Sequence, residues 1–270
     1  MEALIIAAGV GSRLREISKS KPLTPIVGIP LLELGILQVA RAGAERVIVV
    51  TGYRAEAIEA VMPVFSRNAN VPVISHRVEN WLLPNGYSVM AGASLIEGNY
   101  LLTMADHIFE DPILPNLAMQ NAPNRGLTLA IDRRIDSPLL DPDDATWIRT
   151  DQNGYICSIG KAISDYNAVD CGAFLATPEL APAIAASIAA GRQGSLSDGV
   201  QWLADRGRAA TMDVGLSWWL DVDDPRTYAL AEAEATAKLR PIYRGHHGAI
   251  ESKIGGKASA REPTSKIGLA

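Results

Sequence analysis

The sequence lacks the features that mark several common protein classes. Its 270 residues include only two cysteines, Cys157 and Cys171, too few for a disulfide scaffold and without the spacing of a cysteine metal site. No run of about 18 apolar residues occurs, so we expect no transmembrane helix. No basic segment precedes the apolar N-terminal run, which we interpret as a buried strand rather than a signal peptide. These absences favour a reduced, cytoplasmic location.

Charge is limited as well. Charged residues make up 20% of the chain and the formal net charge is -5. Proteins that bind nucleic acids normally show a clustered excess of basic residues, which is missing here. We therefore expect no nucleic-acid partner.

The first hundred residues alternate between two apolar patterns. Short apolar runs are typical of buried parallel strands, and the segments between them have helical spacing. The strand-like runs are 3–8, 45–52, 71–76 and 99–106, and the helical segments are 30–43, 54–65 and 86–98. This alternation predicts an α/β fold with a doubly wound, mostly parallel, Rossmann-like sheet.

The second half is richer in strand-like segments with turn residues between them. These segments are 127–134, 145–151, 154–160 and 208–214, with helices expected near 178–190, at 195–207 and at 224–239. Asp151, Asn153 and Gly154 predict a hairpin turn. We expect a small β-rich part attached to the main sheet.

A glycine-rich segment, AAGVGSRL, follows the first strand directly. At the carboxyl end of a parallel strand, the backbone N–H groups near Gly9 and Gly11 can converge on phosphate oxygens without a Cβ in the way. Arg13 and Lys21 add positive charge close by. The segment is not a Walker A loop, and Leu14 replaces the third glycine of a dinucleotide fingerprint. On these residues alone, an ordinary strand-to-helix turn stays an alternative.

Carboxylates occur where a metal ion would be useful for phosphate chemistry. Asp106 ends a predicted strand, and Asp221 and Asp223 share one face of a short extended segment. Mg²⁺ is commonly held by one or two carboxylates together with phosphates and water. The alternative for Asp223 and Asp224 is that they cap the helix starting near Pro225. His107 is interpreted as a group that orients Asp106 or contacts an acceptor, with a purely structural role as the alternative.

Together these segments resemble the sugar-phosphate nucleotidyltransferase superfamily. The segments are AAGVGSRL, KPL at 21–23, NGYS at 85–88, MADH at 104–107, YNAVDCGAF at 166–174, SLSDGV at 195–200 and WWLDVDDP at 218–225. The first two are common to the superfamily. The Asp-His pair, NGYS and the AVDxGxF segment are most similar to the CTP:inositol-1-phosphate cytidylyltransferases, which are often fused to a CDP-alcohol phosphotransferase. The resemblance implies the nucleotidyltransferase type of sheet, with an acceptor-binding β-rich part.

The resemblance also implies roles for individual residues. Arg13 and Lys21 would bind and activate the nucleotide phosphates, although the longer loop before Lys21 leaves Lys19 open as the main contact. Lys161 would bind the acceptor phosphate. The nucleotide would be contacted by Ala7, Ala8, Gly9, Gly11, Ser12, Asn85, Gly86 and Tyr87. The acceptor would be contacted by His107, Asp170 and Gly172, and Mg²⁺ by Asp106, Asp221 and Asp223.

The implied reaction transfers a cytidylyl group from CTP to a phosphorylated polyol, 1L-myo-inositol 1-phosphate, for phospholipid or di-inositol phosphate synthesis. CDP-inositol and pyrophosphate would be the products, and a membrane CDP-alcohol phosphotransferase a functional partner. One alternative is a hexose 1-phosphate or phosphocholine acceptor. A second is a non-catalytic nucleotide-sensing subunit, which would be expected to lose Lys21, Asp106 or Asp221.

Basic residues concentrate near the C-terminus. Residues 238–270 hold seven lysines and arginines against two acidic residues, and apolar periodicity stops after Pro241. We expect a nucleotidyltransferase domain over residues 1–240 and a basic, disordered tail over 241–270.

Overall fold

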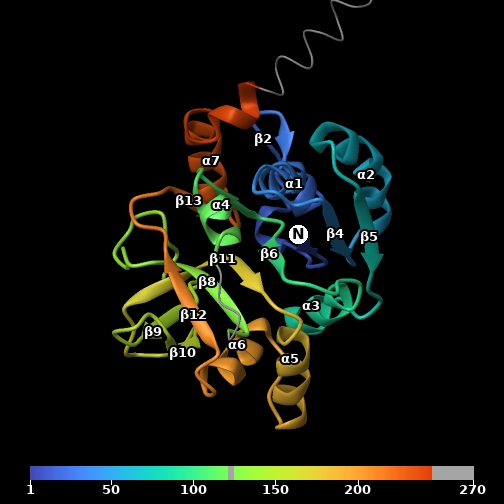
Figure 1. The fold of residues 1–270 in the computed structure, drawn as a ribbon. Helices are drawn as coiled ribbons and strands as arrows, with labels where there is room; N and C mark the ends of the chain where they lie inside the picture. The colour runs from blue at the N-terminus through green and yellow to red at the C-terminus, as the bar shows by residue number, and fades with distance from the viewer. Residues whose placement is uncertain (121–124, 245–270) are drawn as a thin grey trace, which may run out of the picture.

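The computed structural model of the protein describes residues 1–120 and 125–244. Its centre is a mixed sheet with the order β10-β9-β11-β6-β1-β4-β5, to which β8 and β12 are attached beside β11 (Figure 1). The strands are β1 (Glu2–Ala7), β4 (Arg46–Thr51), β5 (Val73–Arg77), β6 (Tyr100–Met104), β8 (Leu127–Asp132), β9 (Trp147–Thr150), β10 (Ile156–Gly160), β11 (Ala168–Ala176) and β12 (Ala209–Asp213).

Strands β6, β1, β4 and β5 form a parallel half with no slip in register. Ile5 of β1, for example, lies between Val49 of β4 and Thr103 of β6. Their uninterrupted apolar runs suit this position, because helices cover a parallel sheet on both faces. The carboxyl ends of all four strands meet at one edge, where the candidate site lies.

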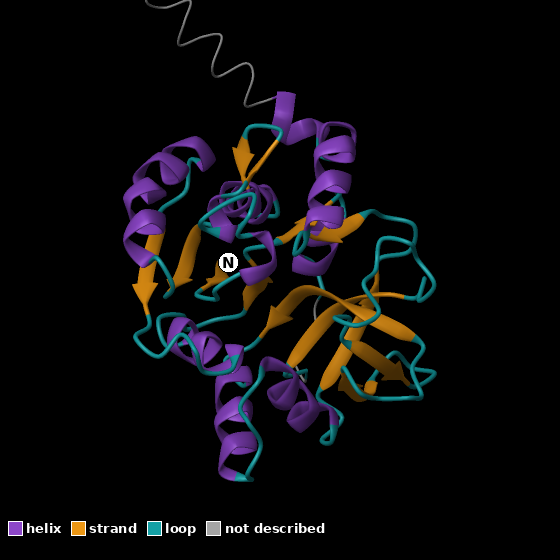
Figure 2. Cartoon of the chain, turned by 180° about the vertical axis from the view of Figure 1, so that it is seen from behind, coloured by secondary structure: helices purple, strands orange, loops and turns teal. Residues whose placement is uncertain are grey.

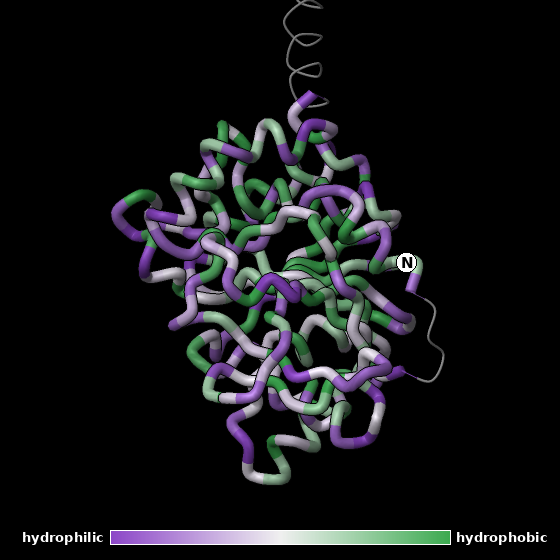
Figure 3. Tube along the Cα trace, turned by 90° about the vertical axis from the view of Figure 1, so that its left-hand side faces the viewer, coloured by the Kyte–Doolittle hydropathy of each residue, from purple (hydrophilic) through white to green (hydrophobic). Residues whose placement is uncertain are grey.

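Helices cover both faces of the sheet. Successive residues of β1 point to opposite sides, so that Ala3 and Ile5 join one apolar cluster and Leu4 and Ile6 the other. The first cluster packs under α1 (Leu31–Arg41), α2 (Ala55–Ala69) and α4 (Ile113–Ala118), and the second under α3 (Asn85–Ala93), α5 (Leu180–Ala189) and α6 (Leu196–Ala204) (Figure 1). Figure 3 shows apolar segments through the interior of the chain and hydrophilic ones along much of its outline.

The second half of the sheet is mostly antiparallel, apart from the parallel pair of β8 and β12. β11 runs antiparallel to β6, β8 and β9, and therefore joins the two halves (Figure 2). The predicted hairpin turn is confirmed: Gly154 has a φ of +78° and lies between β9 and β10. The predicted α/β fold is confirmed too, with the parallel pairing concentrated where strands and helices alternate in sequence. We had not predicted β11 as a strand, because its polar Asp170 and its Gly172 break the apolar pattern.

A third group of elements lies beside the sheet edge. Short strands β7 (His107–Phe109) and β13 (Trp219–Asp221) pair antiparallel, with Asp221 opposite His107. They pack under the helix α7 (Pro225–Lys238) together with the hairpin of β2 (Pro25–Ile26) and β3 (Ile29–Pro30). This pairing carries Asp221 to the end of β6, although more than a hundred residues separate the two in sequence.

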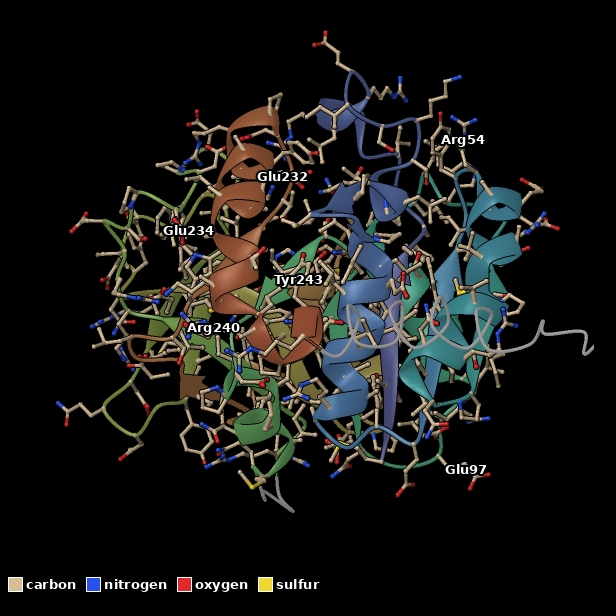
Figure 4. All side chains as sticks on the ribbon, turned by 90° about the horizontal axis from the view of Figure 1, so that it is seen from above. Arg54, Glu97, Glu232, Glu234, Arg240 and Tyr243 are labelled. Atoms are coloured by element: carbon tan, nitrogen blue, oxygen red, sulfur yellow. The ribbon has the colours of Figure 1, made fainter. Side chains whose placement is uncertain are left out.

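Helical structure continues for a few residues beyond 240, the predicted end of the domain. Residues 240–244 form one further helical turn, in which Ile242 and Tyr243 are buried. The Tyr243 hydroxyl donates a hydrogen bond to the Ile26 carbonyl at 2.7 Å, and Figure 4 shows Tyr243 between the end of α7 and the N-terminal segments. Pro241 does not end the packing, because proline is tolerated in the first turn of a helix. The rest of the predicted tail, 245–270, lies outside the described residues.

No helix in the two described ranges is both long and apolar enough to span a bilayer.

A capping box begins α6. The Ser195 hydroxyl accepts a hydrogen bond from the Asp198 backbone N–H at 3.1 Å, and the Asp198 carboxylate accepts one from the Ser195 N–H at 2.9 Å. We expect Ser195→Ala to lower the free energy of unfolding by about 1 kcal/mol, because the side-chain acceptor for one unpaired N–H is lost. Urea denaturation would measure this. Ser94→Ala, at an exposed helix end, is the control and should change stability by less than about 0.5 kcal/mol; equal effects would contradict the assignment.

Candidate active site

The glycine-rich segment forms a cradle at the carboxyl end of β1. Gly11 has a φ of +58°, and a Cβ at this position would overlap the Lys21 side chain. Glycine is therefore required both by the left-handed backbone and by the close approach of Lys21. A cavity of about 180 Å³ lies here, lined by Ile6, Ala7, Gly9, Gly11, Lys21, Pro22, Ala105, Asp106 and Asp223. Two of the three predicted metal carboxylates, Asp106 and Asp223, thus share this cavity with the predicted phosphate cradle.

Lys21 lies at the centre of a cluster of carboxylates. Its Nζ is 2.6 Å from Asp106 Oδ2 and 3.9 Å from Asp221 Oδ1, and it also pairs with Asp223. The Lys21 side chain is only 7% exposed. Lys19, by contrast, is exposed and does not line this cavity. Of the two lysines, only Lys21 lines the cradle cavity, and its contact with phosphate stays a prediction.

The two acids after β13 have different roles. Asp224 accepts a hydrogen bond from the Thr227 N–H at 2.8 Å and caps α7, as its alternative prediction stated. The Asp223 carboxylate instead pairs with Arg13 and Lys21. Asp223 therefore belongs to the cluster of carboxylates at the cradle rather than to the helix cap.

The charges in this cluster shift one another's pKa values. Burial opposes the charged form of Asp106, but Lys21 and His107 outweigh it and hold the pKa of this carboxyl well below its usual value. Burial also disfavours a charged His107, yet the carboxylates of Asp221 and Asp106 raise its pKa to about 9. Burial raises the pKa of Asp221, and the nearby Asp106 charge adds to this. At neutral pH the cluster therefore contains a charged imidazolium beside an ionised Asp106.

His107 is held in place on several sides. Its Nδ1 lies 2.8 Å from Asp106 Oδ1, and its ring is nearly parallel to that of Trp219, with 6.2 Å between the ring centroids and 10° between the planes. On another side lies Gly172, where a Cβ would overlap the imidazole. This geometry fits the predicted role of orienting Asp106. His107 also lines the second cavity described below.

Gly172→Ala tests this close approach. A methyl group would displace the imidazole, and Gly172 has a φ of +75°, which disfavours any side chain. We expect turnover to fall about 10- to 100-fold, because small displacements of catalytic groups have large kinetic effects. Steady-state kinetics would measure this. Gly191→Ala is the matched control, since Gly191 has a φ of +88° with open space around it; a similar loss of turnover in that variant would contradict the explanation.

A second cavity, of about 230 Å³, adjoins the cradle and shares Asp223 with it. Its lining includes Arg13, Asn85, His107, Asp144, Lys161, Asp170, Gly172, Trp219 and Asp221. All four residues predicted to contact the acceptor, His107, Lys161, Asp170 and Gly172, line this cavity. Asp170 accepts a hydrogen bond from the Gly172 N–H at 2.7 Å, and burial raises its pKa to about 6.

Asp141 and Asp144 are charged members of this site that we did not predict. Asp144 pairs with both Lys161 and Arg13, and Asp141 Oδ2 is 3.6 Å from Arg13 Nη1. Burial works against the charge of Asp144, but its bond with Lys161 outweighs this and lowers its pKa. Both acids lie in a loop without apolar periodicity or a known motif, so no sequence signal distinguished them from solvated aspartates.

The NGYS segment is placed differently from the cradle. The Asn85 side chain accepts a hydrogen bond from the Leu196 N–H at 2.8 Å, and Asn85 lines the second cavity. Gly86 and Tyr87 pack against Gly194, and neither lines either of these two cavities. Their contact with the nucleotide stays a prediction.

Two residues of the glycine-rich segment, Ala8 and Ser12, also lie outside these cavities. Ala8 uses its carbonyl to accept a hydrogen bond from the Tyr53 N–H at 3.0 Å, and Ser12 is exposed in a 3₁₀ turn over Ser12–Leu14. Neither lines the cradle cavity or the second cavity. Their predicted contact with the nucleotide therefore stays a prediction.

The carboxylates fit a divalent cation. Potential ligand atoms of Asp106, His107 and Asp221 lie within 4.8 Å of one another, as do those of Asp144, Asp221 and Asp223. Asp221 Oδ1 is buried and accepts no hydrogen bond from the described residues, which suits an oxygen that faces a cation. Mg²⁺ prefers oxygen ligands, so the carboxylates fit it better than the imidazole does.

Comparisons with known proteins agree with this geometry. The profile of the MobA-like NTP transferase domain matches residues 3–195. The chain is 32% identical over 235 residues to the bifunctional IPC transferase and DIPP synthase of Rubrobacter xylanophilus, covering 85% of this chain and 51% of that protein. It is 26% identical to the protein of the same name from Aquifex aeolicus, covering 83% and 49%. The chain thus spans about half the length of these curated relatives.

Solved structures have the same fold. The inositol-1-phosphate CTP transferase from T. maritima superposes with a TM-score of 0.72 at 25% identity, covering 85% of this chain and 94% of that one. A UDP-glucose pyrophosphorylase complexed with UDP-glucose gives a TM-score of 0.73 at 18% identity, covering 88% and 100%. At such low identity the second likeness concerns the fold alone.

Proposed function

This chain belongs to the family of MobA-like NTP transferase domains, and we propose that it transfers the cytidylyl group of CTP to 1L-myo-inositol 1-phosphate. The observation that carries the proposal is the pair of adjoining cavities that share Asp223. One is a glycine cradle with a buried lysine, and the other contains Lys161 and Arg13. Such an arrangement suits two phosphorylated substrates that must meet. The choice of cytidine and inositol rests on the similarity to relatives that carry these names.

In the proposed reaction, a phosphate oxygen of the acceptor attacks the α-phosphorus of CTP. The bond from the α-phosphorus to the oxygen bridging to the β-phosphorus breaks, and pyrophosphate leaves with that bonding pair. CDP-inositol is the other product. The protein forms no covalent intermediate, so catalysis depends on alignment and on stabilising charge.

Residues of both cavities contribute to this reaction. Lys21 neutralises charge that moves towards pyrophosphate. Arg13, which lines the second cavity and pairs with the shared Asp223, contributes a second positive charge. Lys161 orients the acceptor phosphate. Asp106 and Asp221, with Asp223, would hold Mg²⁺, which supplies further neutralisation of the phosphate oxygens when bound.

Several acids of the second cavity suit a polyol. Asp170, Asp141 and Asp144 line it and offer acceptors for hydroxyl groups. A phosphorylated polyol would thus direct its phosphate to Lys161 and its hydroxyls to these carboxylates. A membrane CDP-alcohol phosphotransferase that consumes CDP-inositol, and a cytoplasmic location, are parts of the same proposal.

A substrate panel tests the proposal. Purified protein with Mg²⁺ would receive CTP, UTP or GTP together with inositol 1-phosphate, glucose 1-phosphate or phosphocholine, and pyrophosphate release would be measured. We expect the highest kcat/KM for CTP with inositol 1-phosphate. Preference for another pair would establish one of the alternative acceptors. A thermal shift with CTP but no turnover in any combination would indicate a nucleotide-sensing protein instead.

A further inference from the structure

A buried carboxylate lies behind the candidate site, at the end of β8. The side chain of Asp132 is 2% exposed and accepts four hydrogen bonds. Arg134 donates three of them, from its backbone N at 2.8 Å, its Nε at 2.9 Å and its Nη2 at 2.8 Å. The fourth comes from the indole Nε1 of Trp219 at 2.9 Å. Asp132 is thus fully partnered by groups from two distant segments.

Arg134 extends this network to the segment before β13. Its guanidinium donates to the Ser217 carbonyl at 2.7 Å and to the Leu216 carbonyl at 3.3 Å. Asp132 is buried, whereas the Arg134 side chain is 35% exposed. A buried carboxylate is seldom the most stabilising choice, because apolar groups of similar volume stabilise as well without the cost of desolvation. What the ion pair adds is directional geometry, since the guanidinium fork and the carboxylate both have fixed hydrogen-bond directions.

Trp219 connects the Asp132–Arg134 pair to the candidate active site. It lies two residues before Asp221, so the two side chains leave the same face of β13. Its ring is nearly parallel to that of His107, whose Nδ1 contacts Asp106. Trp219 therefore connects the Asp132–Arg134 pair with Asp221 along β13 and, through His107, with Asp106.

We propose that Asp132 and Arg134 are positioning residues of the active site, which fix the Trp219 indole and through it the directions of Asp221 and His107. The inference rests on the proposed function for its kinetic consequence. Neither Asp132 nor Arg134 lines the cradle cavity or the second cavity. Any effect of changing them on turnover must therefore pass through other residues.

Two substitutions and a control isolate this effect. Asp132→Asn keeps the shape of the side chain but not its charge, and Trp219→Phe keeps an aromatic ring next to His107 but removes the indole N–H. Trp218→Phe is the matched control: Trp218 is equally buried, but its Nε1 donates to no described residue. Trp218 lies in the apolar cluster under α7 and lines neither cavity.

For Asp132→Asn and Trp219→Phe we expect kcat to fall about 10- to 100-fold. The KM for CTP should stay within about twofold, because the cradle is built on β1. The double variant should lose no more than the more affected single variant, since both changes break one connection. Trp218→Phe should keep kcat within about twofold. Unchanged kcat in folded Asp132→Asn, or losses that multiply in the double variant, would overturn the proposal.

A spectroscopic measurement separates this proposal from the proposed function. In ¹H–¹⁵N NMR spectra, Asp132→Asn should shift the Trp219 indole signal and the His107 imidazole signals, whereas Trp218→Phe should leave the His107 signals in place. This result would support the network even if no acceptor yields pyrophosphate, in which case only the proposed function fails. His107 signals that do not move in Asp132→Asn would overturn the network whatever the turnover.

Discussion

Asp106→Asn is expected to lower the proposed cytidylyl transfer about a thousandfold while the fold is retained. Asp106 contacts Lys21 and His107 and lines the cradle cavity. Asparagine has nearly the same shape but no charge, so it is a poor ligand for Mg²⁺ and a weaker partner for the lysine. A bound metal contributes several kcal/mol to reactions at phosphorus, and about 4 kcal/mol corresponds to this loss of rate.

The measurement is pyrophosphate release at saturating substrates over a range of Mg²⁺ concentrations, with circular dichroism to confirm folding. Asp111→Asn is the matched control. Asp111 lies only five residues further along, but its carboxylate is 43% exposed and pairs with Arg41 at the surface. It should keep activity within about twofold. Near-normal turnover of Asp106→Asn with Mg²⁺ supplied would refute the metal assignment.

Lys21→Met is expected to lower turnover about 100- to 1000-fold, the effect of removing one charge-stabilising group from a transition state. Methionine keeps the aliphatic part of the side chain, which packs against Gly11. It removes the ammonium group that contacts Asp106 and Asp223. The change thus affects charge at the cradle more than its shape.

Initial rates over a range of CTP concentrations would separate kcat from KM in this variant. Lys19→Met is the control, because Lys19 is exposed outside the cradle cavity, and it should behave like the unmodified protein. A larger loss in Lys19→Met than in Lys21→Met would assign the phosphate contact to Lys19, which the sequence had left open.

The sequence alone was enough to predict the elements of the parallel half and the residue types at its edge. Apolar runs and helical spacing were sufficient for the alternating elements of the parallel half, since burial on both faces requires continuous apolar strands. The segment after β1 was recognisable because glycine alone combines a left-handed backbone with close approach to another chain segment. Asp106 was recognisable because it follows a predicted parallel strand, and parallel strands end at one edge of the sheet.

Which distant groups meet depends on the packing of the whole domain. Asp144 joins Lys161 and Arg13, and Asp132 reaches Trp219, in each case across a separation that no periodic pattern records. The apolar pattern of β11 is interrupted, yet β11 joins the two halves of the sheet. Its backbone pairs with β6 and β8, which are far away in sequence. The preference of a residue for helix or strand acts over one or two turns or one strand. The contacts of Asp132 and Asp144 depend instead on the register of β13 on β7 and on the path of long loops. That register is settled only when the whole core packs.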